Sequence, residues 1–235
     1  MAALGVCACL AACGGSEAAP EAEAPAASSG NEVPAARSSG GGMQVEGILG
    51  TIPQRKIEDT MQSKLPALQR CFFEGMGEVE YLAGHIKFYF HVGLDGRVEW
   101  VHPRGSSIGH RKTEECLVGV AEKTRFPEPN GGGPAEFVWG FELEGAGGVR
   151  PPVEWDETRV EKAAAAQRAS VDACGVDGEE FRITMYVAPG GKVQAAGAAV
   201  GSQAGAEKLD CVLDAIRGWQ MPDPGSYAAK VSFKL

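Results

Sequence analysis

Three unlike features of this 235-residue chain recur at one spacing, and this repeat constrains the fold more than any other feature of the sequence. A Gly-containing turn occurs at 92–98 and again at 187–193. A cysteine occurs at Cys116 and again at Cys211, and a Pro-x-Pro turn occurs at 127–129 and again at 222–224. The two members of each pair are 95 residues apart. Three independent matches at one offset indicate an internal duplication, in which one supersecondary unit is used twice.

Each copy is predicted to form a helix, a β-hairpin, a second helix and a final strand. Apolar residues recur at helical spacing over 57–72 and alternate along 86–92 and 181–187. Pro66 should kink the first helix or mark a new start. The predicted fold class is therefore α+β, with two tandem small domains, each α-β-β-α-β with a three-stranded antiparallel sheet packed by two helices. One face of each sheet is expected to face helices and the other to face water.

Composition and the repeat together set the domain boundaries. Among residues 14–43, 26 of 30 are Ala, Gly, Ser, Pro or Glu. A segment of this composition has too few large apolar side chains to offset the entropy that is lost when the chain becomes ordered. We therefore expect a disordered linker over 13–46. The two domains are predicted at 47–145 and 153–235, joined by a linker at 146–152.

The first residues resemble the export signal of bacterial lipoproteins. Leu10-Ala11-Ala12-Cys13 is similar to a lipobox, which implies a diacylglyceryl group on Cys13 and removal of 1–12 as a signal peptide. A signal peptide opens with Lys or Arg, and the first such residue here is Arg37, so we expect 1–12 to be truncated by a start codon assigned too late. Gly14 in place of Asp favours the outer membrane, with the chain lipid-anchored in the cell envelope and facing the periplasm.

Seven cysteines divide into a signal segment, a lipid site and two pairs. Two leave with residues 1–12, Cys13 carries the lipid, and four remain, two per copy. In an exported protein the duplication favours pairing within each copy, Cys71 with Cys116 and Cys174 with Cys211, over the other two connectivities. The alternative is four free thiols in packed cores. Because the chain has no C-x-x-C pair among these four, we expect no zinc site.

Charge and histidine placement exclude several classes of function. A net charge of −9 argues against nucleic-acid and anionic-lipid surfaces, and there is no run of 18 apolar residues.

His91 and His102 could approach across the hairpin as a metal or acid–base site. The matching positions in copy two are Tyr186 and Gly197, however, so the shared fold does not need them, and solvated histidines are the favoured interpretation. With no shared catalytic set, we expect no enzyme and no cofactor.

Aromatic side chains in copy one either belong to its core or form an exposed patch for partner contact. Tyr89 has the parity of the polar strand face, and Trp100 and His91 belong to the same hairpin. Copy two offers Ala and Gly at 195–199 instead. We therefore expect copy one to carry any binding and copy two to be mainly a structural companion.

The order of these features resembles a known family. A helix with Cys, a hairpin with a Gly turn, a helix with Cys, Phe-Pro-x-Pro and an alternating last strand are similar to the AgmX/PglI C-terminal domain of envelope and gliding-motility proteins. Copy two, with Trp219-Gln220-Met221-Pro222 before a strand ending at 231–235, is also similar to the C-terminal domain of TonB. The likeness covers about 48–144 and 153–235.

The resemblance implies a non-enzymatic cell-envelope lipoprotein whose two TonB-C-like domains contact envelope proteins in a motility, transport or secretion assembly. TonB-type domains capture a partner peptide at a sheet edge, and the same edge pairing could make a homodimer. The sequence shows no TonB-like membrane helix, so active energy transduction by this chain alone is not expected. The alternative function is a peptidoglycan-binding or structural envelope module.

Overall fold

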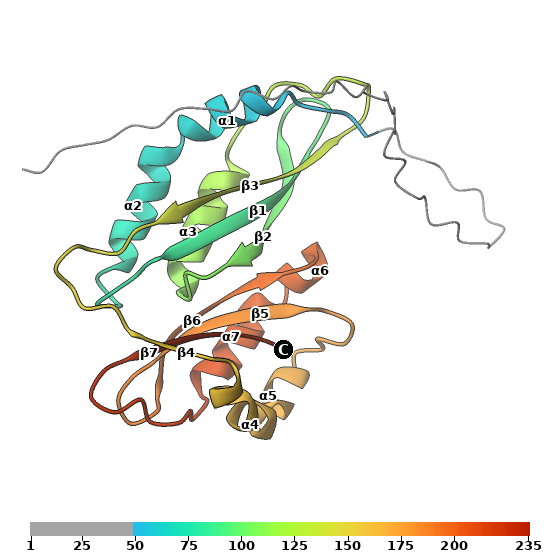
Figure 1. Ribbon diagram of the computed structural model, residues 1–235. Coiled ribbons are helices and arrows are strands. Elements are labelled where there is room, and N and C mark those ends of the chain that lie inside the picture. The colour runs from blue at the N-terminus through green and yellow to red at the C-terminus, as the bar shows by residue number, and fades with distance from the viewer. Residues whose placement is uncertain (1–48) are drawn as a thin grey trace, which may run out of the picture. The chain divides into compact units, whose positions relative to one another are not determined.

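The computed structural model describes residues 49–235, which form two similar series of helices and strands (Figure 1). The first series is α1 (Gln54–Gln62), α2 (Leu65–Gly75), β1 (Gly84–Val92), β2 (Val98–Ser106), α3 (Arg111–Glu122) and β3 (Ala135–Leu143). The second is β4 (Val153–Trp155), α4 (Thr158–Gln167), α5 (Ala169–Asp172), β5 (Phe181–Val187), β6 (Val193–Val200), α6 (Gln203–Ala206), α7 (Leu209–Arg217) and β7 (Ala229–Lys234). The fold is therefore mixed α+β. The signal segment 1–12 and the whole of the linker predicted at 13–46, including Cys13, lie outside the described residues.

Both series lie in one compact unit. None of the helices in the described part combines the length and the apolar character that crossing a bilayer requires. Pro66 lies in the first turn of α2, where its missing N–H leaves no helical hydrogen bond unmade. Of the two predicted outcomes, the proline therefore marks a new helix start.

The first sheet has the predicted three antiparallel strands in the order β2-β1-β3. The β1–β2 hairpin turns at Asp95-Gly96, where Gly96 has a φ of 78°, a conformation that glycine adopts without strain. A single parallel bridge joins Gly50, just before α1, to Ala135 at the start of β3. The rest of the outer edge of β3 has no neighbouring strand within the described residues.

The second sheet has four strands in the order β4-β7-β5-β6, one more than predicted. The extra strand, β4, runs parallel to β7 and pairs Val153 with Ala229. Gly50 precedes Val153 by 103 residues, the same spacing that relates Cys71 to Cys174. The three-residue strand β4 therefore corresponds to the single bridge that Gly50 forms with β3 in the first half. A strand of three residues is too short to show an alternating pattern, and only the backbone of β7 defines it.

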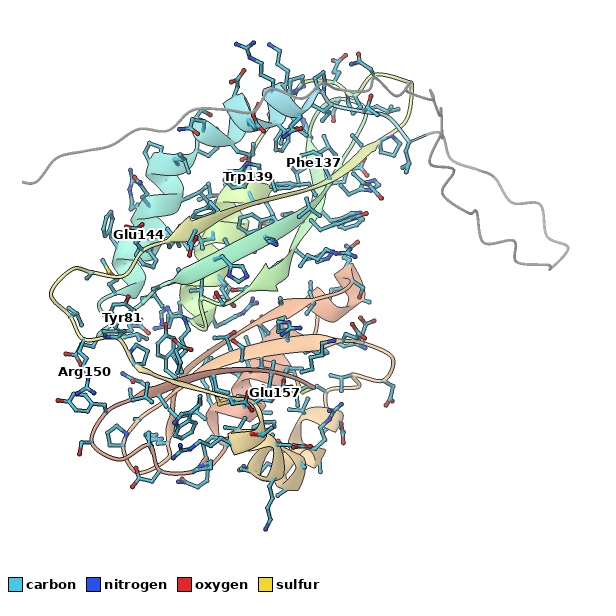
Figure 2. All side chains as sticks on the ribbon, viewed as in Figure 1. Tyr81, Phe137, Trp139, Glu144, Arg150 and Glu157 are labelled. Carbon is cyan, nitrogen blue, oxygen red and sulfur yellow. A yellow bond between two sulfur atoms is a disulfide. The ribbon has the colours of Figure 1, made fainter. Side chains whose placement is uncertain are left out.

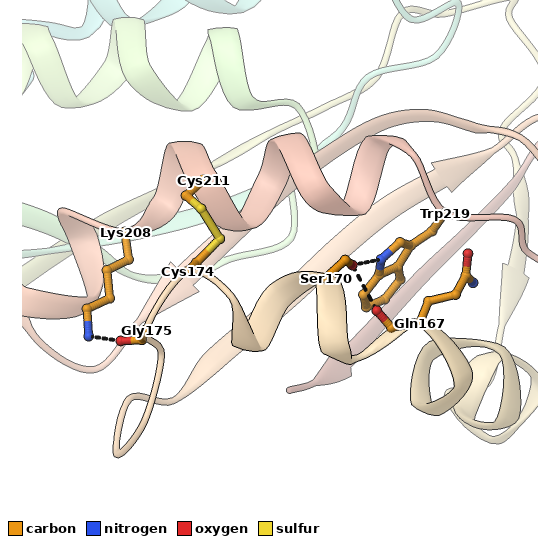
Figure 3. Close-up of a disulfide and its surroundings, with 7 residues drawn as sticks. All are labelled: Gln167, Ser170, Cys174, Gly175, Lys208, Cys211 and Trp219. Carbon is orange, nitrogen blue, oxygen red and sulfur yellow. Dashed lines mark hydrogen bonds between the residues drawn. A yellow bond between two sulfur atoms is a disulfide. The ribbon is translucent and has the colours of Figure 1, made fainter.

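Each half contains its own apolar core and one disulfide. Cys71–Cys116 joins α2 to α3, and Cys174–Cys211 joins the chain after α5 to α7 (Figure 3). The bonds close loops of 45 and 37 residues, for which the loop-entropy model gives about 4 kcal/mol each. Beside the second bond, the Trp219 indole donates to Ser170 Oγ at 2.8 Å. The connectivity is the within-copy one that the duplication favours.

The outer face of the second sheet is covered, which corrects the expectation that this face meets water. Thr184 and Tyr186 on β5 and Ala195 on β6 are all buried, and Tyr186 and Ala195 belong to the core of the first half. The Thr184 hydroxyl donates to the Ser106 carbonyl at 3.3 Å, which ties β5 to the end of β2. Small residues at 195–199 allow this close approach, and their pattern alone does not reveal what covers them.

A buried carboxylate lies at this contact between the halves. Glu114 on α3 has no exposed surface, and it accepts hydrogen bonds from Ser106 Oγ at 2.6 Å and from the Ala198 N–H at 3.0 Å. A methyl group added at Gly197 would overlap the carboxylate. Burial raises the pKa of Glu114 to about 7, although its hydrogen bonds and the nearby Arg111 act in the opposite direction.

Two further polar contacts join the halves. Arg111 on α3 pairs with Asp210 on α7 at 2.7 Å, and the buried Lys230 ammonium donates to the Ala83 carbonyl at 2.7 Å. Both contacts use charged groups whose partners are supplied by the other half. The joint therefore combines close packing with several satisfied polar groups.

Replacing Glu114 by Gln should change the pH dependence of stability. The folded pKa of about 7 exceeds the ordinary value of 4.5, so the folded state holds an additional proton between these values. The resulting stabilisation is present below about pH 4.5 and is lost as the pH rises through 7. Between about pH 5 and pH 8, Glu114→Gln should gain roughly 2–3 kcal/mol of unfolding free energy relative to wild type. Urea denaturation at a series of pH values measures the difference.

Glu122→Gln, an exposed change on the same helix, is the matched control and should follow the wild-type curve. Wild type and Glu114→Gln giving parallel curves would contradict the assignment.

Candidate functional site

The outer face of the first sheet carries a row of stacked rings, called here the aromatic ladder: His91, Trp100, Tyr89 and His102. Strand register places His91 opposite Trp100 and Tyr89 opposite His102. Ring centroids lie 4.9 Å apart for His91 and Trp100 and 5.5 Å apart for Trp100 and Tyr89, with nearly parallel planes. The structure thus brings together all three residues predicted to contact a partner, Tyr89, Trp100 and His91.

The carboxylate of Glu136 contacts the polar atoms of two rings in the aromatic ladder. Glu136 on β3 accepts a hydrogen bond from the Tyr89 hydroxyl at 2.5 Å and lies 2.9 Å from His91 Nδ1. This hydrogen bond raises the pKa of Tyr89, and the bonds from Tyr89 and His91 lower the pKa of Glu136. Glu136 therefore links the ladder to the edge strand of the sheet.

The geometry of His91 does not suit a metal ion. Glu136 faces Nδ1, whereas Glu99 lies 3.3 Å from Nε2, on the opposite side of the ring. Trp100 and Tyr89 lie between His91 and His102 in the ladder, so the two histidines do not share a site. In residues 49–235 no group of three or more His, Cys, Asp or Glu side chains is arranged to hold a metal ion.

His102 forms the inner end of the aromatic ladder. It is 2% exposed, and neither ring nitrogen has a hydrogen-bond partner among the described residues. Burial, with a smaller contribution from Arg104, lowers the pKa of His102. The Arg104 guanidinium itself lies 5.2 Å from the centroid of the Tyr89 ring. The lowered pKa favours the neutral form of the His102 ring.

The edge strand β3 presents free backbone groups along one side. Its nine residues pair with β1 in unbroken register. Gly50 N–H donates to the Pro134 carbonyl at 2.8 Å, so the Pro134 carbonyl points away from β1. Because backbone groups alternate along a strand, those of Val138, Gly140 and Glu142 also point to the open side.

The other long edge is less accessible than β3. The β1–β2 pairing is shifted at two places, and β2 carries Pro103 and Arg104, features that disfavour further pairing. In β3, Val138 is 50% exposed, and Phe137 and Trp139 lie partly buried on the helix side (Figure 2). That β3 forms an edge of the sheet was not predicted from the sequence. The absence of Lys and Pro over 135–143 is the signal that could have identified it.

The chain matches no protein-family model, and comparison with curated proteins and with solved structures also gives no match. The resemblance to AgmX/PglI and TonB domains therefore stays a prediction from the sequence.

Removing the Tyr89 hydroxyl should weaken the link between the aromatic ladder and β3. Tyr89→Phe deletes the hydrogen bond to Glu136 and should lower the unfolding free energy by about 1 kcal/mol. The effect should vanish in a Glu136→Ala background, because the acceptor is already absent. Tyr227→Phe, which changes a half-exposed ring in the second half, is the control and should leave stability nearly unchanged. Equal losses in both Glu136 backgrounds would contradict the coupling.

Proposed function

We propose that this chain is a non-enzymatic cell-envelope lipoprotein that binds other envelope proteins, and that a partner strand pairs with β3. The observation that carries the proposal is the open edge of β3, which has nine residues, no register shift and no Lys or Pro. An edge of this kind is a template for adding a strand from another chain. The TonB-like sequence pattern supports the same mode of binding.

The surroundings of β3 favour binding with little loss of freedom. Glu136 is held from one face by Tyr89 and His91, and Phe137 and Trp139 pack toward the core on the other. A strand fixed in this way needs little further ordering when a partner pairs with it. The exposed Val138 side chain adds apolar area at the centre of the edge.

The lipoprotein part of the proposal rests on the lipobox at Cys13 and on the linker composition. A flexible coil of this length has an end-to-end distance of roughly 30 Å. It would keep the folded part close to the membrane, on the periplasmic face of the outer membrane. Two disulfides in a small protein support an oxidising compartment of this kind.

A proline at Val138 should block strand addition without disrupting the sheet. The Val138 N–H points away from β1, so Val138→Pro removes a donor that only an added strand would use. A photo-crosslinking residue at Glu142, in intact cells, should recover a specific envelope protein with wild type. We expect this product to be lost in Val138→Pro and retained in Val138→Ala, which keeps the N–H.

Crosslinking that is equal in the proline and alanine variants would contradict pairing at β3. A crosslinked product that contains only a second copy of this chain would contradict an envelope partner and indicate a homodimer. Binding of both variants to purified peptidoglycan would favour the alternative cell-wall module. The melting temperature of Val138→Pro shows whether the sheet is intact.

Replacing Cys13 by Ser should release the chain from the membrane. Without the thiol there is no attachment site for the diacylglyceryl group that would tether the chain. We expect metabolic labelling with a radioactive fatty acid to mark wild type and not Cys13→Ser. Cys9→Ser is the control and should keep the label. A labelled Cys13→Ser variant would contradict lipidation at this position.

A further inference from the structure

The second half contains a groove between α4 and the end of β7. Its volume is about 490 Å³, and its apolar walls include Ala164 and Phe233. Glu157 lies at the start of α4, on the rim of the groove, together with Glu161 (Figure 2). The groove is far along the chain from β3 and belongs to the other repeat.

The duplication explains why this space is open. Helix positions in the two halves are related by 103 residues, so Ala164 corresponds to Met61, which is completely buried. Strand register shows that Phe233 corresponds to Trp139. Phe233 pairs with Ile183 in the second sheet, and Trp139 pairs with Phe88, the equivalent of Ile183, in the first sheet. Both walls therefore carry smaller side chains in the second half. The first half shows that the fold accepts a side chain as large as Met at this place.

The charges on α4 indicate what kind of segment fits. Glu157 and Glu161 are one helical turn apart, both line the groove, and neither forms an ion pair within residues 49–235. Arg168, at the other end of α4, is already paired with Asp172 at 2.9 Å. Lys234 supplies a positive charge on the opposite wall. The α4 wall thus offers two unpaired carboxylates to an incoming cation.

Backbone groups of β7 favour an extended ligand. Leu235 N–H donates to the Phe181 carbonyl, so the N–H and C=O of Lys234 point away from β5, toward the side of β4. The strand β4 ends at Trp155, opposite Val231, and does not reach Lys234. These free groups can bond to an extended segment lying along the groove.

We propose that this groove binds an extended segment of a partner protein through a large aliphatic side chain, of Met or Leu size, that neighbours a Lys or Arg. The aliphatic side chain occupies the space that Met61 fills in the first half, and the basic residue pairs with Glu157 and Glu161. This gives the second repeat a binding role of its own, beyond that of a structural companion, and it does not depend on strand pairing at β3.

A phage-displayed library of random nonapeptides, selected on the full chain, tests the proposal. Selected peptides should carry an aliphatic residue beside a basic one, and a synthetic copy should bind in fluorescence anisotropy. Ala164→Met restores the residue of the first half and should weaken binding roughly tenfold or more. Ala166→Met lies on the same helix, is exposed and does not line the groove, so its affinity should stay within about twofold of wild type.

A charge reversal tests the basic contact separately. Glu161→Lys should weaken binding roughly fivefold or more, and Glu207→Lys, exposed and away from the groove, should have no effect. Thermal unfolding of each variant verifies the fold. Selected peptides without the aliphatic–basic pair, or with equal affinity for Ala164→Met and wild type, would overturn the inference. Peptides that no longer bind Val138→Pro but still bind Ala164→Met would also overturn the inference, and they would support strand pairing at β3.

Discussion

The packing of α3 against the outer face of the second sheet determines how the two repeats fit together. The Glu114 carboxylate lies against the backbone of β6 because Gly197 has no side chain to exclude it. A buried carboxylate is acceptable only when its oxygens receive hydrogen bonds, which Ser106 and Ala198 provide from the two halves. The second repeat has Leu209 at the matching helix position, so the carboxylate belongs to the joint and not to the repeated fold.

The two halves share an order of elements but present different surfaces. In the first, bulky rings cover the outer sheet face and β3 has an open edge. In the second, the β6 part of the corresponding face carries small residues, the face is buried at Thr184 and Tyr186, and part of the corresponding edge is covered by β4. The smaller residue Ala164 opens a groove in the second repeat at the place where Met61 fills the core of the first. One framework therefore supports two surfaces of different chemistry.

Much of the framework could be predicted because it depends on local pattern. The Asp95-Gly96 turn, the strand alternation around Phe88 and the helix start at Pro66 each leave a signal within a few residues. The grouping of Tyr89 with Trp100 followed from their place on one predicted hairpin. What could not be predicted depends on distant contacts: β4 is defined only by β7, Tyr186 has the parity of a surface residue, and Glu114 looks like an ordinary charge on a helix. The carboxylate of Glu136 meets the ladder only through the register of β3.

The placement of the two disulfides has a mechanical consequence. Each bond closes a loop within one repeat, Cys71 to Cys116 and Cys174 to Cys211, and no covalent bond other than the main chain connects one repeat to the other in the described part. Under tension applied at the ends of this region, the residues inside the two loops cannot extend. The extension must come from the residues outside the loops, 49–70, 117–173 and 212–235, so a pulled molecule would lengthen by a limited amount and keep two crosslinked loops.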